Sequence, residues 1–268
     1  MNLAPLFILA GLYLIVQVTF NGVLDGYGIF RDEFYYLVNA ERLAWGYVDH
    51  PPLAPLLLTG VQATLGESTV ALRLLPALAG AGTVLLVGLT ARRMGGTLAA
   101  QTIAALSVIA VPVYGVMFGF YSMNAFEVLL WAGTAYVVVV LLADDQPKLW
   151  LLFGLLVGIG LQNKHTFVLF AMGLALGLLL HRRSAFHSRW LWLGGLLALV
   201  IFLPNLIWQV EHGWPTLEFY AGAAGKNINR SPVEVLLDQL LTMNPLLLTV
   251  WLPGLVWLLC SPVFRPLA

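Results

Sequence analysis

The sequence predicts an all-α polytopic membrane protein, on the evidence of its composition, its apolar segments and one long polar interruption. Hydrophobic residues make up 60% of the 268 residues and charged residues only 10%, which is far from the averages of soluble domains. A membrane helix needs about 20 consecutive apolar residues, and eight segments approach or reach that length. The longest polar stretch, 31–55, lies between the first two segments. We therefore expect about eight transmembrane helices with the chemistry concentrated in a loop.

The fifth and sixth apolar segments are short and almost continuous. Only Asn163, Lys164 and His165 separate them, so we expect a helix pair joined by a buried polar elbow. The full set of predicted spans covers residues 3–21, 70–91, 97–117, 124–143, 149–162, 166–180, 189–208 and 244–260.

Glycine spacing indicates how this helix pair packs. Gly154 and Gly158 lie on the fifth segment, and Gly173 and Gly177 lie on the sixth. This small-xxx-small spacing lets the backbones of two membrane helices approach closely. Glycine is also simply common in membrane helices, so both explanations stay open.

The charge distribution predicts which side of the membrane each loop occupies. Threading the spans places the loops 22–69, 118–123, 163–165 and 209–243 on one side. The opposite side carries seven basic residues against two acidic ones. Because basic residues in short loops favour the cytoplasm, we expect the four polar loops to face outward from the cytoplasmic (inner) membrane.

The stretch 31–55 contains an expected interfacial helix. Phe34, Leu37, Val38 and Trp45 fall at helical spacing, which gives a helix with one apolar side. Such a helix is suited to lying flat at a membrane surface. We therefore expect an amphipathic helix in the first outward loop.

Two acidic spots flank this helix, Asp32 with Glu33 before it and Asp49 with His50 after it. An aspartate in front of a helix is often only an N-cap, and Asp-His before two prolines is also typical of a solvated turn. A helix over 33–44 is about 18 Å long, and the five residues after it span at most about 17 Å. The chain is thus long enough to return Asp49 towards Asp32.

Other polar residues near the membrane have both functional and ordinary explanations. Lys164 at membrane depth is costly and therefore a functional candidate with an anion as its partner, although a lysine also reaches the interface by snorkelling. Arg73 and Glu127 lie one turn inside their spans on the same side. His212 fits a metal ligand, a proton carrier or an ordinary loop histidine.

Several classes of function have no support in the sequence. The zero net charge and the lack of any nucleic-acid-binding motif argue against a nucleic-acid partner. The GxGxxG, Walker, GxSxG and HExxH patterns do not occur. We therefore expect no nucleotide cofactor.

The sequence contains four short motifs in order, namely Asp32-Glu33, Tyr-Val-Asp-His-Pro-Pro-Leu at 47–53, Leu-Arg-Leu-Leu-Pro at 72–76, and Asn163-Lys164. Taken together, these motifs resemble the GT-C membrane glycosyltransferases over essentially the whole chain. The nearest resemblance is to glycosyltransferase family 39, which includes protein O-mannosyltransferases and the lipid A aminoarabinose transferase. It implies transfer of a sugar from a polyprenyl-phosphate donor to a lipid, glycan or protein acceptor, with inversion, on the periplasmic side. Family chains continue through further spans, so we expect residues 1–268 to be the N-terminal part of one GT-C-like domain.

The resemblance also implies an acid-base and metal site. Asp32 matches the catalytic base of the family, and Glu33 is its neighbour in the motif. Asp49 matches an acidic metal ligand, and His212 matches a metal-binding histidine more loosely. A divalent cation is therefore an expected cofactor.

A second set of positions is implied to bind the donor phosphate. Lys164 matches a basic residue that contacts this phosphate, and we group Arg73 with it. His50 stands where the family has a lysine, which makes any positive charge there dependent on pH. Asn124 replaces an aspartate of many relatives, which puts in doubt any role that needs a charge at that position.

Two alternatives stay open. A transporter or lipid-binding membrane protein would use the same polar residues without chemistry, but transporters more often show internal repeats and broken helices at mid-membrane. A purely structural membrane subunit leaves the acidic loop unexplained. The clustering of polar residues on one side favours an enzyme.

Overall fold

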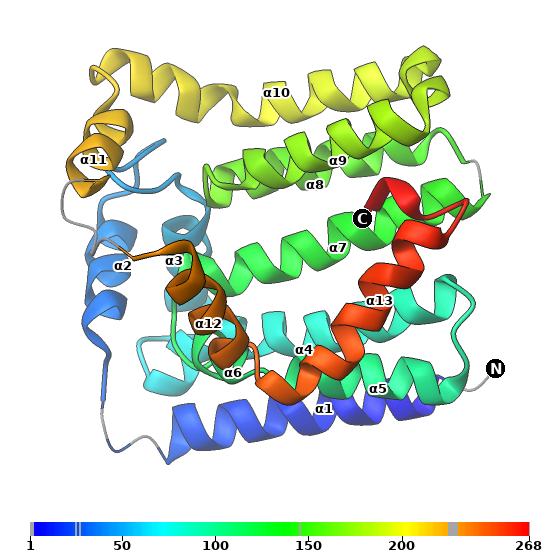
Figure 1. Ribbon diagram of the computed structural model, residues 1–268. Coiled ribbons are helices and arrows are strands. Elements are labelled where there is room, and N and C mark those ends of the chain that lie inside the picture. The colour runs from blue at the N-terminus through cyan, green and yellow to red at the C-terminus, as the bar shows by residue number, and fades with distance from the viewer. Residues whose placement is uncertain (1–2, 25, 27, 145, 225–229, 268) are drawn as a thin grey trace.

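The computed structural model describes residues 3–24, 26, 28–144, 146–224 and 230–267, and in this part of the chain it contains helices and no strand. Long helices lie side by side and alternate in direction between the two ends of a bundle (Figure 1). The elements are α1 (Ala4–Gln17), η1 (Val18–Val23), α2 (Arg31–Glu41), α3 (Leu53–Leu65), α4 (Thr69–Arg93), α5 (Leu98–Ile109), α6 (Pro112–Met117), α7 (Met123–Asp144), α8 (Leu149–Asn163), α9 (Phe167–His181), η2 (Arg183–His187), α10 (Arg189–Glu211), α11 (Pro215–Ala224), α12 (Pro232–Thr242), η3 (Pro245–Leu247), α13 (Leu248–Cys260) and η4 (Arg265–Leu267).

The predicted fold class, an all-α polytopic membrane protein, is confirmed. Every predicted apolar segment is largely helical. Among the described residues four helices have the length and hydropathy of a membrane span, namely α1 with η1, α4, α7 and α10, and the count is up to five if α12 with η3 and α13 forms one broken span. The number of helices long enough to span a membrane is therefore below the expected eight, because α5, α8 and α9 are shorter than a full span.

Polar residues and proline account for the short helices. The third predicted segment divides into α5 and α6 at Pro112, which has no N–H to continue the ladder of α5. The expected polar elbow separates α8 from α9 at residues 164–166. The predicted connection 209–243 contains two short helices, α11 and α12, and α12 meets the next helix at 94°.

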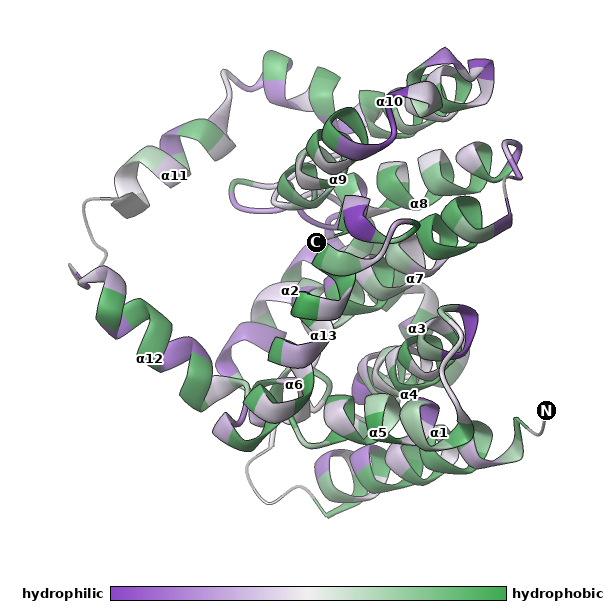
Figure 2. Ribbon diagram, turned by 45° about the vertical axis from the view of Figure 1, so that its right-hand side comes forward, coloured by the Kyte–Doolittle hydropathy of each residue, from purple (hydrophilic) through white to green (hydrophobic). Residues whose placement is uncertain are grey.

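The four predicted outward loops meet at one end of the bundle, on the left in Figure 1. Arg73 at the start of α4 binds Glu33 of α2, and Thr216 of α11 donates to the carbonyl oxygen of Tyr47 at 3.5 Å. Figure 2 shows α11 and α12 standing apart from the other helices on the same side. Lys226, in the predicted loop between them, lies outside the described residues.

The predicted close approach of backbones occurs at Gly154 and Gly158, and the partner helix is α10. A Cβ atom built on Gly154 would overlap the backbone of Gly194, and one built on Gly158 would meet Ile201 and Ala198, all on α10. The close approach is therefore between α8 and α10 rather than between α8 and α9.

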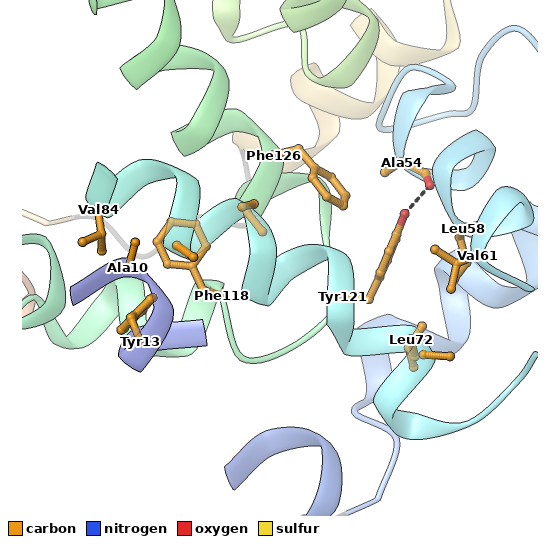
Figure 3. Close-up of a cluster of buried hydrophobic side chains, with 14 of the residues drawn as sticks. Ala10, Tyr13, Ala54, Leu58, Val61, Leu72, Val84, Phe118, Tyr121 and Phe126 are labelled. Carbon is orange, nitrogen blue, oxygen red and sulfur yellow. Dashed lines mark hydrogen bonds between the residues drawn. The ribbon is translucent and has the colours of Figure 1, made fainter. Parts of the chain in front are cut away.

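A buried aromatic core lies beneath the polar end of the bundle. Tyr121 and Phe118, in the connection before α7, are fully buried. The Tyr121 hydroxyl donates a 2.6 Å hydrogen bond to the carbonyl oxygen of Ala54 in α3, beside Leu58 and Leu72 (Figure 3). This bond satisfies the phenol inside an apolar cluster. It also ties the polar stretch 22–69 to the connection 118–123.

The expected interfacial helix forms as α2 but over 31–41, so Trp45 lies outside it. Its buried face consists of Glu33, Tyr36, Asn39 and Ala40. The apolar side chains predicted to face the membrane are left on the outside, and Phe34 and Val38 are more than half exposed. The helix thus has one polar, protein-bound side and one apolar, uncovered side.

Candidate active site

Glu33 is locked into the protein by four hydrogen bonds. Its carboxylate is 0% exposed and pairs with Arg73, whose Nη2 lies 2.6 Å from Oε2 and whose Nε lies 3.0 Å from Oε1. The backbone N–H groups of Tyr121 and Phe30 each donate to it at 2.8 Å. Arg73 also donates to two loop carbonyl groups. We therefore give this pair a structural role, and their implied roles in catalysis and phosphate binding stay predictions.

Asp32 has the opposite environment one residue earlier. The helix begins at Arg31 with Phe30 as its N-cap, so the N-cap explanation for Asp32 was wrong. Glu33 reaches back to the Phe30 N–H and fills that role. The Asp32 side chain is 48% exposed, and the Nε of Arg31 donates to it at 3.0 Å. Its other carboxylate oxygen has no partner among the described residues.

Asp49 returns to the helix that begins beside Asp32. The hydroxyl of Tyr35, one turn along α2 from Asp32, donates to Oδ1 of Asp49 at 2.6 Å. Burial, followed by this bond to Asp49, raises the pKa of Tyr35 to about 12. Burial also raises the pKa of the Tyr36 phenol, and the charges of Asp49 and Asp32 add to that effect. The structure therefore brings both acidic spots to the same helix.

His50 is fully buried in a ring of tyrosines rather than open to a ligand. Its ring stacks on Tyr36 with the centroids 5.2 Å apart and contacts Tyr35 and Tyr47. A carbonyl oxygen can only accept, so Nδ1 carries the proton that bonds Pro51 at 2.8 Å. Burial lowers the pKa of His50. This neutral imidazole stabilises the loop, and its implied phosphate contact stays a prediction.

Lys164 extends from the elbow between α8 and α9 to the first turns of α7. Its ammonium donates to Glu127 Oε2 at 2.8 Å and to Asn124 Oδ1 at 2.9 Å. Thr166 donates to the other oxygen of the same glutamate at 2.6 Å. Asn163, also of the elbow, donates to the carbonyl oxygen of Met123 at 2.8 Å. The elbow is thus fastened to the start of α7 through Lys164, Thr166 and Asn163.

Helix α11 lies against the acidic loop, since Thr216 donates to the carbonyl oxygen of Tyr47. Burial raises the pKa of Tyr220 on α11, and the negative charges of Asp49 and Glu127 raise it further.

A family model described as dolichyl-phosphate-mannose-protein mannosyltransferase matches residues 49–208, more than half of the chain. The chain belongs to this family. Membership implies a glycosyltransferase with a polyprenyl-phosphate sugar as its donor, in a multi-pass membrane protein. No curated protein and no solved structure matches the chain significantly.

The region of this mannosyltransferase-family protein that the model matches contains Asp49, His50, Arg73 and the pair of Lys164 and Glu127. Asp32, Glu33 and His212 lie outside the matched residues. The roles implied for them therefore rest on the resemblance of the sequence motifs and not on the family match.

His212 lies at the end of α10, away from any described cluster of metal-ligating side chains. Its Nδ1 donates to the carbonyl oxygen of Trp208 at 2.8 Å, and its ring stacks on Trp208 at 4.2 Å. Within the described ranges, no three His, Cys, Asp or Glu side chains gather as metal ligands do. The structure thus supplies no complete ligand set around Asp49 and His212.

Sequence reasoning missed several residues that shape the site of this glycosyltransferase. Tyr35, Tyr220 and Asn205 read as ordinary helix residues. Asn205 donates to the carbonyl oxygen of Trp45 at 2.8 Å and accepts from His165 at 3.0 Å, which joins α10 to the first loop and the elbow. A polar residue inside an apolar span is the one signal that pointed to Asn205.

Proposed function

We propose that this protein transfers a sugar from a polyprenyl-phosphate donor to a hydroxyl group of a lipid, glycan or protein acceptor at the outer, periplasmic face of the cytoplasmic membrane. One observation supports this proposal most directly. An exposed carboxylate, Asp32, and an anchored ammonium, Lys164, lie at the same end of the helix bundle in a protein of this family. The narrower assignment to glycosyltransferase family 39 is part of the proposal.

Asp32 acts as the general base. It removes the proton of the acceptor hydroxyl as that oxygen attacks the anomeric carbon from the face opposite the phosphate. The bond from the anomeric carbon to the phosphate oxygen breaks, its electron pair leaves with the polyprenyl phosphate, and the configuration is inverted. A free oxygen on an exposed carboxylate is suited to accept this proton. Glu33 is a poor candidate for the base, because both oxygens of its carboxylate already accept hydrogen bonds.

Lys164 stabilises the departing phosphate. The leaving group develops negative charge, and a cation already fixed in place offsets that charge without reorganising during the reaction. The lysine side chain is only 23% exposed, so water screens its charge weakly. The side-chain oxygen of Asn124 accepts a hydrogen bond from the Lys164 ammonium. This bond keeps the ammonium directed at the polar end of the bundle.

A divalent cation remains a proposal with Asp49 and His212 as its candidate ligands. A carboxylate and an imidazole suit several such metals, and the cation would supply charge near the phosphate. Tyr35 already binds one oxygen of Asp49, and a third protein ligand is not found in the described part of the chain. We therefore assign no step of the reaction to a metal.

The proposal is tested by transfer of label from a polyprenyl-phosphate sugar to a membrane or protein fraction. Lys164→Met should reduce transfer strongly, whereas Lys148→Met, in the connection at the opposite end of the bundle, should leave it unchanged. Chelation followed by metal replacement tests the cation separately. Label that stays on the donor while the lipid crosses unchanged would favour a transporter and overturn the proposal.

A further inference from the structure

Glu127 is the shared partner of two residues on the elbow. Its Oε2 accepts from Lys164 at 2.8 Å and its Oε1 accepts from Thr166 at 2.6 Å. Neither donor belongs to α7, which carries the glutamate. The glutamate is almost fully buried. Both carboxylate oxygens are therefore used, and one of them is used to hold the lysine.

The lysine needs such a partner because its side chain is long and flexible. A protonated amine in a poorly hydrated recess is costly unless an opposite charge compensates it. Asn124 offers only an uncharged oxygen. Glu127 is the one carboxylate that contacts Lys164 among the described residues. Without Glu127, no opposite charge would compensate the Lys164 ammonium, and the side chain would turn towards water.

The contacts also leave room for a ligand. An ammonium group has three N–H donors, and the described contacts use two of them, to Asn124 and Glu127. The side chain is partly exposed, so an anion can reach it. Glu127 thus holds the Lys164 amine while one N–H donor of that amine is left for a ligand.

We propose that Glu127 is the positioning residue that presents Lys164 to the donor phosphate. This inference rests on the proposed function. Glu127 itself touches no reacting atom and acts through the lysine. The competing explanation is that Glu127 only fastens the elbow to α7 through Thr166, in which case its charge would be dispensable.

Three variants separate these explanations. Glu127→Gln keeps the shape and loses the charge, and should raise the KM for a polyprenyl-phosphate sugar roughly tenfold, as expected for loss of a hydrogen bond to a charged group. Glu127→Asp should recover part of that loss. Thr166→Val removes the other bond and leaves the charge beside Lys164, so it should change KM much less. Equal effects of Glu127→Gln and Thr166→Val would overturn the proposal.

A double-mutant cycle tests whether Glu127 acts through the lysine. In a Lys164→Met background, adding Glu127→Gln should change the donor KM less than about twofold, because the group it positions is gone. Full additivity of the two losses would contradict the proposal.

Chemical labelling of the lysines tests the role of Glu127 without depending on sugar transfer. The chain has three lysines, Lys148, Lys164 and Lys226, so acylation of each by an amine-reactive reagent can be followed by mass spectrometry, with Lys148 as the internal standard. Glu127→Gln should accelerate labelling of Lys164 relative to Lys148. Unchanged relative labelling would refute the positioning role. Absence of sugar transfer by the unaltered protein would instead refute the proposed function.

Discussion

Asp32 and Glu33 are neighbours in the chain with opposite environments, and this contrast sets the roles given to them. The side chain of Glu33 points into the protein towards Arg73, while that of Asp32 is half exposed. Successive helical residues point about 100° apart. One turn of a helix therefore carries both a structural ion pair and the proposed base.

Asp32→Asn tests the base directly. The change keeps size and polarity but removes the proton acceptor, so the rate of sugar transfer should fall about 10² to 10⁴-fold. Because Asp32 is not the N-cap of α2, the helix should be unaffected. Glu41→Gln, an exposed acid at the other end of α2, is the matched control. Near-normal transfer by Asp32→Asn would exclude it as the base.

Breaking the Glu33 and Arg73 pair should destabilise the protein. Removing one partner leaves a buried charge uncompensated, which costs about 3 to 5 kcal/mol. Glu33→Ala and Arg73→Ala should each lower the thermal unfolding temperature in detergent. The double variant should lose less than the sum of the single losses, because it leaves neither charge alone. Single variants as stable as the unaltered protein would show that the pair is not structural.

His50 gives the first loop a dependence on pH. Burial lowers its pKa in the folded state below the ordinary value of 6.5, so the unfolded state binds the proton more readily. The stabilising contribution is complete above about pH 6.5 and declines as pH falls towards the folded-state pKa. His50→Gln should remove this component from the difference in unfolding temperature between pH 7.5 and pH 5.5. An identical pH response in both proteins would contradict it.

At the scale of elements, the contact between α8 and α10 is made possible by two facing glycines. A Cβ atom on Gly154 would overlap the backbone of Gly194, so Gly154→Ala must push the helices apart. We expect a loss of about 1 to 3 kcal/mol, as for other overpacked sites. Gly173→Ala on α9 is the control, since a Cβ there meets nothing within 4 Å. Thermal unfolding of the two variants should differ clearly, and equal stability would show that α8 and α10 do not pack as described.

At the scale of the whole molecule, polar loops gather at one end and basic connections at the other. Cys260 is the only cysteine, so a Cys260→Ser background allows single-cysteine labelling. Val48→Cys and Glu218→Cys, at the site end, should react with an impermeant thiol reagent from outside. Lys148→Cys should react only after the membrane is permeabilised. Labelling of positions 48 and 218 from opposite sides would remove the basis for a shared site.

The class of the protein, the order of its helices and the gathering of its polar loops follow from the sequence alone. Apolar segments of membrane length and the alternation of loops between two sides are local or sequential properties, and both can be read along the chain. The elbow at Lys164 follows for the same reason. For the return of the chain towards α2, the reach of five residues showed only that the return was possible.

Only the tertiary structure decided which side chains meet. Glu33 and Asp32 are adjacent acids in the sequence, and only the burial of Glu33 against Arg73, Tyr121 and Phe30 separates their environments. Glu127 became the partner of Lys164 through a contact across 37 positions, and Gly154 met α10 rather than α9. Such contacts depend on how helices pack and on which face each turns inward. A sequence pattern records the period of a helix, but it does not record the neighbour that the helix will contact.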